Sequence, residues 1–323
     1  MRYSRSRQLN LIKRAVECFF LKRPYCVSFE VTYSCNATCA HCHLGGPVNE
    51  KRAAPQEFGR LSREIKPLVA QISGGEPLLR RDLEEIIQEI KAPQGVPYVV
   101  VTTNGATLSR DRYKSLIQAG VDEFSLSLDY PDERHDAFRG IPGLFRRLEN
   151  LVKSLPADRD KAIVLACVVQ SDNYKDLIRI ADLAKEWGVK LNFSTYTYLR
   201  TQDKKFLLNE KQREELKEII RRLLDYKKQH GIVLTSEYVF ENMVDFFRDE
   251  EIPDCRTGRK FFVINPDATL SPCGLILRDY QSRKEIINKF SKNNTCTYCY
   301  TSIRANSEKP LKYLLKDSLN AIK

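Results

Sequence analysis

Residues 32–43 read TYSCNATCAHCH, and they follow directly on an apolar segment, 26–32, that is typical of a β-strand. This short loop carries three cysteines within eight positions: Cys35, Cys39 and Cys42. Three thiolates from one loop can bind three irons of a cubane cluster and leave a fourth iron without a protein ligand. The alternative that the spacing allows is a zinc site in which His43 joins the three cysteines.

Outward from this loop, apolar and β-branched runs alternate with stretches of helical periodicity as far as residue 232. Strands are predicted over 26–32, 68–73, 98–102, 123–128, 162–169 and 189–194, and helices over 55–67, 81–91, 109–119, 144–155, 173–187 and 209–230. A repeated strand–helix order predicts an α/β fold whose parallel sheet is covered by helices, either doubly wound or closed into a partial barrel. In both folds the functional side chains lie at the carboxyl ends of the strands.

Small and polar residues stand where several of these strands end. The second strand runs into Ser73-Gly74-Gly75-Glu76-Pro77, the third into Thr102-Thr103-Asn104-Gly105, and the fourth carries Ser125, Ser127 and Asp129 on one face. Glycines allow close approach to the backbone, and a fixed carboxylate can hold an ammonium group. Each stretch alone is an ordinary turn. Their succession, beginning with a three-cysteine loop, favours a site for a nucleoside-like ligand.

The combination Cys35-x3-Cys39-x2-Cys42 with Gly74-Gly75-Glu76-Pro77 resembles the radical S-adenosylmethionine (radical SAM) superfamily over about residues 25–200. The resemblance implies a partial (β/α)6 TIM-like barrel and a [4Fe–4S] cluster on the three cysteines, with SAM bound at its open iron. It also implies SAM contacts from eight residues: His41, Gly74, Gly75, Glu76, Asn104, Ser127, Asp129 and Val168. The implied reaction is reductive cleavage of SAM to a 5′-deoxyadenosyl radical, fed by a low-potential donor such as a flavodoxin or ferredoxin.

A second cysteine group has the spacing Cys255-x17-Cys273-x22-Cys296-x2-Cys299, around a β-hairpin predicted over 261–265 and 268–271. Four thiolates saturate either one zinc ion or one iron–sulfur cluster. The region resembles a shortened SPASM extension, or twitch domain, although Ala268 replaces the more usual glycine. That resemblance implies one auxiliary [4Fe–4S] cluster in a small C-terminal hairpin and helix extension. The full extension has seven cysteines, so a second auxiliary cluster is not expected.

The predicted organisation has three parts: a basic amphipathic segment over 1–24, a barrel over 25–232, and a C-terminal extension over 233–323. The extension ends in a basic tail helix that is predicted to begin at Pro310. The net charge of +11 belongs to the ends of the chain, since residues 1–23 hold seven Lys or Arg against one Glu, and residues 278–323 hold ten against four acids. The near-neutral middle disfavours nucleic acid as a partner. The basic ends serve solubility, or contact an anionic membrane surface or an acidic partner.

Residues Gln8–Leu21 predict a basic amphipathic helix whose apolar positions are Leu9, Ile12, Val16, Phe19 and Phe20. Such a helix packs on the barrel or lies peripherally on a membrane. The longest apolar run, Ala162–Val169, is too short to span a bilayer. Clustered cysteines without a secretory signal predict a reducing, cytoplasmic setting.

The sequence thus predicts an enzyme that abstracts hydrogen from an unactivated carbon of a small-molecule or lipid-like substrate, with Tyr198 and Arg200 as substrate contacts after the sixth strand. One alternative is a peptide-modifying maturase of the same superfamily. It is disfavoured because only about 24 residues precede the first strand, too few for a peptide-binding domain. The other alternative is a zinc-stapled, nucleic-acid-binding protein.

Overall fold

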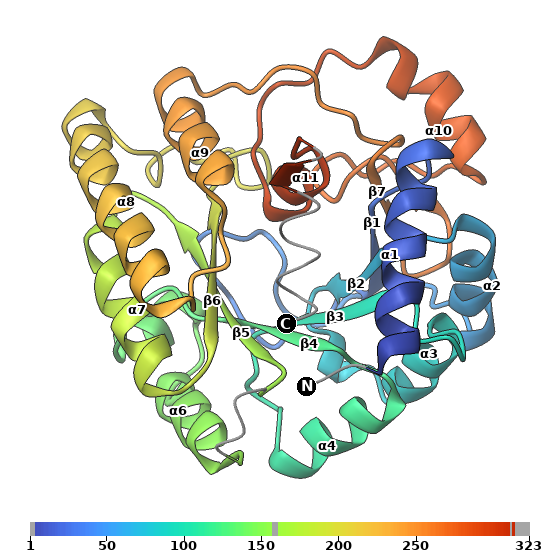
Figure 1. Cartoon of the computed structure of the whole chain (residues 1–323), viewed down its shortest axis with the longest axis horizontal. Coiled ribbons are helices and arrows are strands. Elements are labelled where there is room, and N and C mark those ends of the chain that lie inside the picture. The colour runs from blue at the N-terminus through green and yellow to red at the C-terminus, as the bar shows by residue number, and fades with distance from the viewer. Residues whose placement is uncertain (1–3, 157–160, 311, 314–323) are drawn as a thin grey trace.

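A computed structural model describes residues 4–156, 161–310 and 312–313. A single curved, mostly parallel sheet has the strand order β6-β5-β4-β3-β2-β1-β7-β8 (Figure 1). Its strands are β1 Cys26–Thr32, β2 Val69–Gly74, β3 Tyr98–Thr103, β4 Glu123–Ser127, β5 Ile163–Val169, β6 Lys190–Thr195, β7 Phe261–Ile264 and β8 Leu270–Ser271. The predicted α/β fold with a partial, TIM-like barrel is confirmed.

Most of the helices cover the outer face of this sheet, whereas α1 lies at its amino-terminal edge and α11 lines the inner cavity. The helices are α1 Arg5–Phe20, α2 Pro55–Ile65, α3 Leu83–Ile90, α4 Arg110–Ala119, α5 Arg134–Arg139, α6 Leu144–Ser154, α7 Leu177–Glu186, α8 Glu210–His230, α9 Glu237–Asp249, α10 Arg283–Lys289 and α11 Ser302–Ser307. Short 3₁₀ turns occupy Pro77–Leu79, Tyr174–Asp176 and Ser291–Asn293. The helix that the sequence predicts over 209–230 begins at an Asn209–Gln212 capping box and ends at Gly231, whose φ is +68°.

The core lies between the sheet and its helices. Strand side chains such as Phe29, Ile72 and Val101 are fully buried, and helices α3 and α6 turn Ile86 and Leu148 onto them. The apolar positions of these helices recur at helical spacing, so each presents one apolar stripe to the sheet. This packing fixes the strand ends relative to one another.

The six strands of the predicted barrel are confirmed within one or two residues at each end. After residue 232 the strand–helix alternation ends, as the sequence indicated, and α8 is followed by a second helix, α9, that the sequence did not predict. Helix α5 was also not predicted. The basic tail helix predicted from Pro310 lies largely outside the described residues.

Strand β7 extends the barrel sheet by pairing in parallel with β1, with Cys26 opposite Phe261 and Phe29 opposite Ile264. Strand β8 then pairs with β7 in the antiparallel sense and completes the predicted hairpin. The C-terminal cysteine region is therefore attached to the strand that leads into the first cysteine loop. Helix α11 packs against β1, β6 and β7 and so lies across the gap between the two edges of the barrel (Figure 1).

Within the described residues, no helix combines the length and apolar character needed to cross a membrane.

Candidate functional site

One cavity of about 300 Å³ brings the two cysteine groups together on the inner side of the sheet. His41 and Cys42 line it from the first cysteine loop. The second group lines it with all four of its members: Cys255, Cys273, Cys296 and Cys299. Side chains from β1, β2, β5 and β6 complete the wall, including Glu30, Gly74, Val168 and Thr195. Cysteines that are more than 200 residues apart in the chain therefore face one space.

The first cysteine loop is held by helix α5, which follows β4. The backbone N–H of Thr38 donates to the carbonyl of Arg139 at 3.0 Å, and that of Ala40 donates to the carbonyl of Phe138 at 3.0 Å. Burial raises the pKa of the Cys39 thiol, and the positive charge of Arg139 opposes that rise. Helix α5 therefore fixes the backbone of this loop and places a positive charge that favours the ionised form of the Cys39 thiol.

Arg139 supplies that charge from a buried position. Its Nη1 lies 3.6 Å from the Sγ of Cys39, and its Nε donates to the Oδ2 of Asp129 at 2.8 Å. The other oxygen of Asp129 accepts from the backbone N–H of Val168 at 3.0 Å. Burial is the largest single influence on the pKa of Asp129 and raises it, but Arg139, His41, His135 and the backbone N–H of Val168 together outweigh burial, so the net pKa is lowered. Asp129 is therefore an ionised anchor that orients Arg139 toward the cysteine loop.

The glycines after β2 make room for the protein's own backbone. A Cβ at Gly74 would lie 2.1 Å from the carbonyl oxygen of Thr32, and one at Gly75 would lie 2.2 Å from that of Ser34. Gly74 also has φ +127°, which side chains rarely adopt. These two residues let the end of β2 pack against the start of the cysteine loop.

Glu76 is almost fully buried, and its two oxygens already have protein partners. Oε1 accepts from the hydroxyl of Thr103 at 2.6 Å, and Oε2 accepts from the backbone N–H of Asn104 at 2.8 Å. The amide of Asn104 in turn donates to Asn36, inside the cysteine loop, at 2.8 Å. Glu76 therefore ties the ends of β2 and β3 to that loop.

His41 presents a neutral imidazole to the cavity. Its ring stacks on Phe138 with centroids 4.8 Å apart and an angle of 16° between the rings. Burial lowers the pKa of His41 to about 4, so the ring is uncharged at neutral pH. Its buried Nδ1 has no hydrogen-bond partner among the residues that the structure describes. A buried polar atom of this kind calls for a ligand partner.

Glu30 and Arg200 lie between the two cysteine groups. Arg200 donates from Nη2 to the carbonyl of Gly274, beside Cys273, at 2.8 Å, and its Nη1 lies 3.9 Å from the Sγ of Cys42. The same Nη2 is 3.9 Å from the Oε1 of Glu30. Glu30 is 5% exposed, and its Oε2 has no hydrogen-bond partner within the described part of the chain. Burial raises the pKa of Glu30, and Arg200 compensates only in part.

Replacing Glu30 by glutamine is expected to stabilise the protein at neutral pH. The raised pKa means that folding disfavours the charged carboxylate, so a neutral side chain of equal shape removes a penalty of about 1 kcal/mol or more. Arg200 keeps its hydrogen bond to Gly274. The measurement is the free energy of unfolding in urea for the wild type and Glu30→Gln.

Glu50→Gln is the matched control, because Glu50 accepts from the backbone N–H of Tyr33 at 2.7 Å and from Arg52 at 2.8 Å. The loss of a well-partnered carboxylate there should lower the free energy of unfolding. Equal destabilisation by both substitutions would show that Glu30 is an ordinary structural ion-pair partner.

The second cysteine group is held together by Arg304, which is 0% exposed. Its guanidinium donates to the carbonyl of Cys299 at 2.7 Å, to those of Ile252 and Pro253 at 2.8 and 2.7 Å, and to the carboxylate of Glu308 at 3.0 Å. These bonds join the chain segment that leads to Cys255 with the segment that carries Cys299. Burial raises the pKa of Cys255 to about 12 and of Cys299 to about 11, and Arg304 opposes both shifts.

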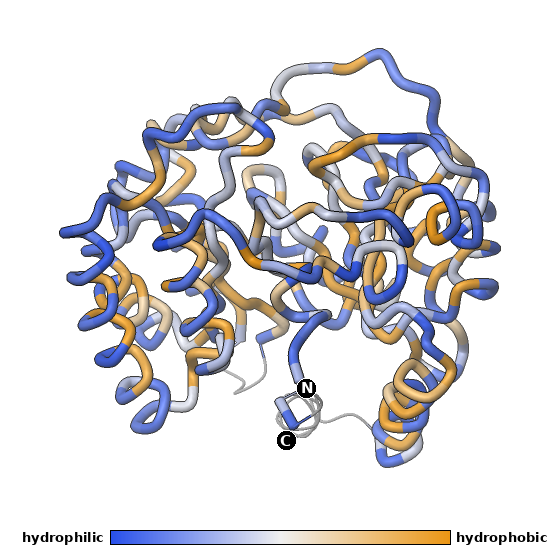
Figure 2. Tube along the Cα trace, turned by 90° about the horizontal axis from the view of Figure 1, so that it is seen from above, coloured by the Kyte–Doolittle hydropathy of each residue, from blue (hydrophilic) through white to orange (hydrophobic). Residues whose placement is uncertain are grey.

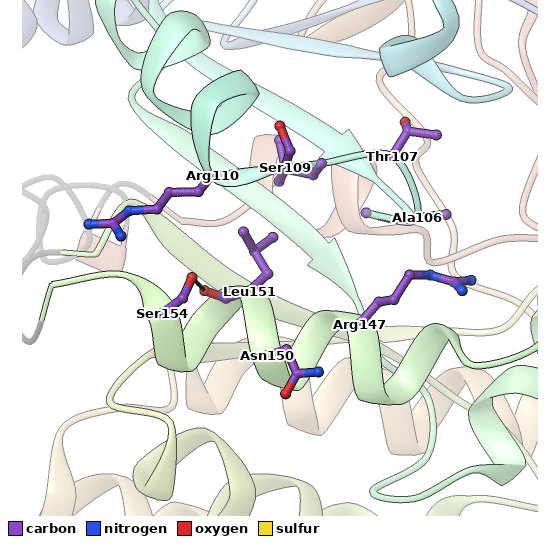
Figure 3. Close-up of a pocket in the computed structure, with 10 residues that line it drawn as sticks. Ala106, Thr107, Ser109, Arg110, Arg147, Asn150, Leu151 and Ser154 are labelled. Carbon is purple, nitrogen blue, oxygen red and sulfur yellow. Dashed lines mark hydrogen bonds between the residues drawn. The ribbon is translucent and has the colours of Figure 1, made fainter.

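A separate hollow of about 440 Å³ lies between the loop after β3 and helix α6. Figure 3 shows Arg110 and Arg147 at its two sides, with Leu151 between the two elements. It contains none of the cysteines and none of the predicted contact residues. The cavity at the cysteines is therefore the candidate site.

A family profile described as the radical SAM superfamily matches residues 29–205, which is more than half of the chain. The chain belongs to the radical SAM superfamily. It is 33% identical over 172 residues to an AdoMet-dependent heme synthase from Methanosarcina barkeri, covering 51% of this chain and 48% of that one. It is 31% identical over 266 residues to a probable GTP 3′,8-cyclase from Methanococcus aeolicus, covering 77% and 84%.

This radical SAM chain spans about half the length of several of the curated relatives that it matches, the Methanosarcina protein among them. Among solved structures, it superimposes on Streptococcus suis SuiB bound to S-adenosylmethionine with a TM-score of 0.66 and 17% identity, covering 89% of this chain and 71% of that one. At that identity the likeness concerns the fold alone. The chain is thus a radical SAM enzyme, and its relatives carry several different reaction names.

Membership of the superfamily implies one [4Fe–4S] cluster and SAM. The residues of the first cysteine loop are suited to bind both groups. Three cysteines suit a cluster with one open iron. His41, whose buried Nδ1 has no partner among the described residues, lines the same cavity as Cys42, Gly74 and Val168. Arg139 adds positive charge beside the anionic ligand set. Within the described residues, no group of three or more His, Cys, Asp or Glu side chains is close enough to share a single metal ion.

The predicted contact residues are distributed unevenly around the cavity. His41, Gly74, Val168 and Arg200 line it, whereas Gly75, Glu76, Asn104, Ser127, Asp129 and Tyr198 are not among its lining residues. Tyr198 instead packs against an aromatic cluster that contains Phe206 and Tyr196, and it lies under the ammonium of Lys204. In the sequence, the alternation of Glu30 with Thr32 along the first strand indicates a position inside the barrel. Arg139 follows the fourth strand in the stretch His135-Asp-Ala-Phe-Arg139-Gly140, which is compatible with a structural or a substrate-facing role. No sequence signal points to Arg304.

Proposed function

We propose that this enzyme abstracts hydrogen from an unactivated carbon of a polar small molecule held between two iron–sulfur sites. The observation that carries the proposal is the shared cavity, since His41 and Cys42 line one part of it and the four later cysteines line another. A substrate there would meet the SAM side and the second cysteine group at once.

In this proposal Cys35, Cys39 and Cys42 hold the first cluster, and His41, Gly74 and Val168 contact SAM. When bound, the cluster and SAM supply the hard chemistry, a one-electron reductive cleavage that yields a 5′-deoxyadenosyl radical able to take hydrogen from carbon. The chain's own residues position and shield these groups. The other predicted SAM contacts act from positions behind the cavity lining: Gly75, Glu76, Asn104, Ser127 and Asp129. Among them, Glu76 orients the cysteine loop, and Asp129 orients Arg139.

We further propose that Cys255, Cys273, Cys296 and Cys299 bind one auxiliary [4Fe–4S] cluster in a twitch-like extension. The support is the predicted hairpin, now seen as β7 and β8, and the buried Arg304 beside the ligands. The proposed functional regions are the amphipathic segment 1–24, the barrel 25–232 and the extension 233–323. The extension is not structurally separate, because its strand β7 pairs with β1 of the barrel. A cytoplasmic setting and a flavodoxin or ferredoxin as electron donor complete the proposal.

Glu30 and Arg200 are the proposed substrate contacts. The free Oε2 of Glu30 accepts a hydrogen bond from a hydroxyl or ammonium group, and Thr195, whose hydroxyl also has no partner among the described residues, lines the same cavity. Both atoms lose hydration without gaining a protein partner, which is costly unless a ligand replaces the water. Tyr198 is the weaker candidate because it packs outside the cavity lining.

Anaerobically reconstituted, reduced protein is expected to convert SAM into 5′-deoxyadenosine and methionine, and to contain about eight irons per chain from two four-iron clusters. Product formation tests the first site, and metal analysis tests the second. Iron near four with one equivalent of zinc would assign the second group to a structural zinc site while leaving the first intact. Absence of 5′-deoxyadenosine from fully loaded, reduced protein would overturn the proposed reaction.

A further inference from the structure

Helix α1 packs on the barrel through its polar face. Arg7 donates to the carbonyl of Gly95 at 3.1 Å and forms an ion pair with Asp122, Asn10 donates to the carbonyl of Gln94 at 3.1 Å, and Arg14 donates to that of Pro67 at 3.2 Å. Cys18 is buried on the same side. Positions 7, 10, 14 and 18 share one helical face, so the hydrogen bonds and the ion pair that hold α1 come from that face, beside the partly buried Leu11 and Ala15.

The apolar face of α1 consequently points away from the protein. Its exposed side chains are Leu9 at 65%, Ile12 at 40%, Val16 at 46%, Phe19 at 45% and Phe20 at 72%, followed by Leu21 at 58%. These positions lie on the opposite side of the helix from the docked ones. Figure 2 shows α1 at the lower right as a coil with hydrophobic residues along its length. A continuous apolar stripe on the surface marks an interaction site.

The positive charge around this apolar stripe indicates which kind of partner binds it. Arg5 and Lys13 are exposed on α1, and Lys22 is exposed just beyond its end. Glu17, the one acidic residue among residues 1–23, is engaged by Arg14 and Arg23 at 3.3 and 3.0 Å. A second copy of this chain would bring like charges together across a symmetric interface. An anionic lipid surface instead neutralises the basic residues and accepts the apolar side chains.

We propose that α1 docks this protein on an anionic membrane surface, with its apolar stripe in the lipid headgroup region. The inference stands apart from the proposed reaction. At 1.5 Å per residue the 16-residue helix offers about 24 Å of contact along the bilayer. The helix is already folded and anchored by Arg7 and Arg14, so docking orders no additional chain.

This docking also orients the cavity. Pro67, Gly95 and Asp122, which hold α1, immediately precede β2, β3 and β4, so α1 lies across the amino-terminal edge of the sheet. The first cysteine loop and the end of β2 lie at the carboxyl-terminal edge. A docked molecule therefore holds its cavity away from the bilayer and receives its substrate from water. Among the predicted substrate classes, this geometry favours a soluble small molecule over a lipid.

The test is flotation of the full chain with vesicles of phosphatidylcholine alone, or of phosphatidylcholine containing phosphatidylglycerol, at low and high salt. Wild type is expected to float with the anionic vesicles at low salt and to be released by high salt. The double variant Leu9→Gln/Phe20→Gln removes two strongly exposed apolar side chains. Its binding to anionic vesicles should be weaker than that of the wild type by about tenfold or more. Leu277→Gln, an exposed leucine outside α1, is the matched control and should bind like wild type.

Three outcomes would overturn the proposal. One is no flotation of wild type with either vesicle, and another is equal binding by the wild type and the double variant. The third is a concentration-dependent dimer, seen by sedimentation without vesicles and abolished by the double variant, which would assign the stripe to a second copy. Circular dichroism of both variants checks that α1 remains folded.

Discussion

Replacing Cys39 by alanine is expected to abolish SAM cleavage and to lower the iron content from about eight to about four per chain. Cys39 is the middle cysteine of its loop, and the backbone on both sides of it is fixed by α5 through Thr38 and Ala40. The methyl group of an alanine at this position cannot bind iron, so the loop loses one of its three thiolates. Production of 5′-deoxyadenosine and iron per chain are measured on the same anaerobic preparation.

Cys26→Ala is the matched control, because Cys26 is buried in β1 and belongs to neither cysteine group. It should retain about eight irons and near wild-type cleavage. If Cys39→Ala kept its full iron content and its activity, the first loop would not be the ligand set, and the proposed reaction would lose its basis. Retention of about four irons in that variant also locates them at the second group.

Replacing Arg304 by methionine is expected to remove the second cluster while leaving the first. The change leaves the buried carboxylate of Glu308 without its ion pair and three carbonyl oxygens without a donor. Loss of one partner from a buried ion pair costs about 3–5 kcal/mol. The segments that carry Cys255 and Cys299 then separate, so iron should fall to about four per chain. Cleavage of SAM to 5′-deoxyadenosine should persist.

Arg283→Met is the matched control, because Arg283 also donates to backbone carbonyls in this region, those of Gly258 and Lys22, at 3.1 and 2.7 Å, without approaching the second cysteine group. It should keep about eight irons. The double variant Cys296→Ala/Cys299→Ala should reproduce the iron loss of Arg304→Met without removing the arginine. If Arg304→Met folds and retains both clusters, Arg304 serves overall stability and does not hold the ligand set.

Local sequence was sufficient to find the barrel strands and the first cysteine loop. Strand and helix periodicity depends on neighbouring residues, so the six predicted strands were found within one or two residues of their ends. The three-cysteine motif is equally local, because one loop supplies all of its ligands. The hairpin around Pro266 could be predicted for the same reason, since consecutive residues form its turn.

Contacts between residues that are distant in the sequence could not be predicted from local patterns. Arg139 reaches Cys39 over 100 positions and Arg200 reaches Cys42 over 158, and no local pattern encodes such pairs. The parallel pairing of β7 with β1 is likewise set by which sheet edge remains available after the barrel strands have paired. This pairing places the second cysteine group against the first.

By itself the sequence determined the alternating α/β pattern, the two cysteine groups and the amphipathic character of residues 8–21. Only the tertiary structure decided which face of α1 packs inward. The usual expectation is that the apolar stripe is buried, but at the amino-terminal edge of the sheet α1 meets backbone carbonyls and the carboxylate of Asp122. Acceptors left unpaired there would be costly, so they draw Arg7 and Arg14 inward and turn Leu9 and Phe20 outward. Periodicity fixes which residues share a face, and the chemistry of the surface that a helix meets fixes where that face points.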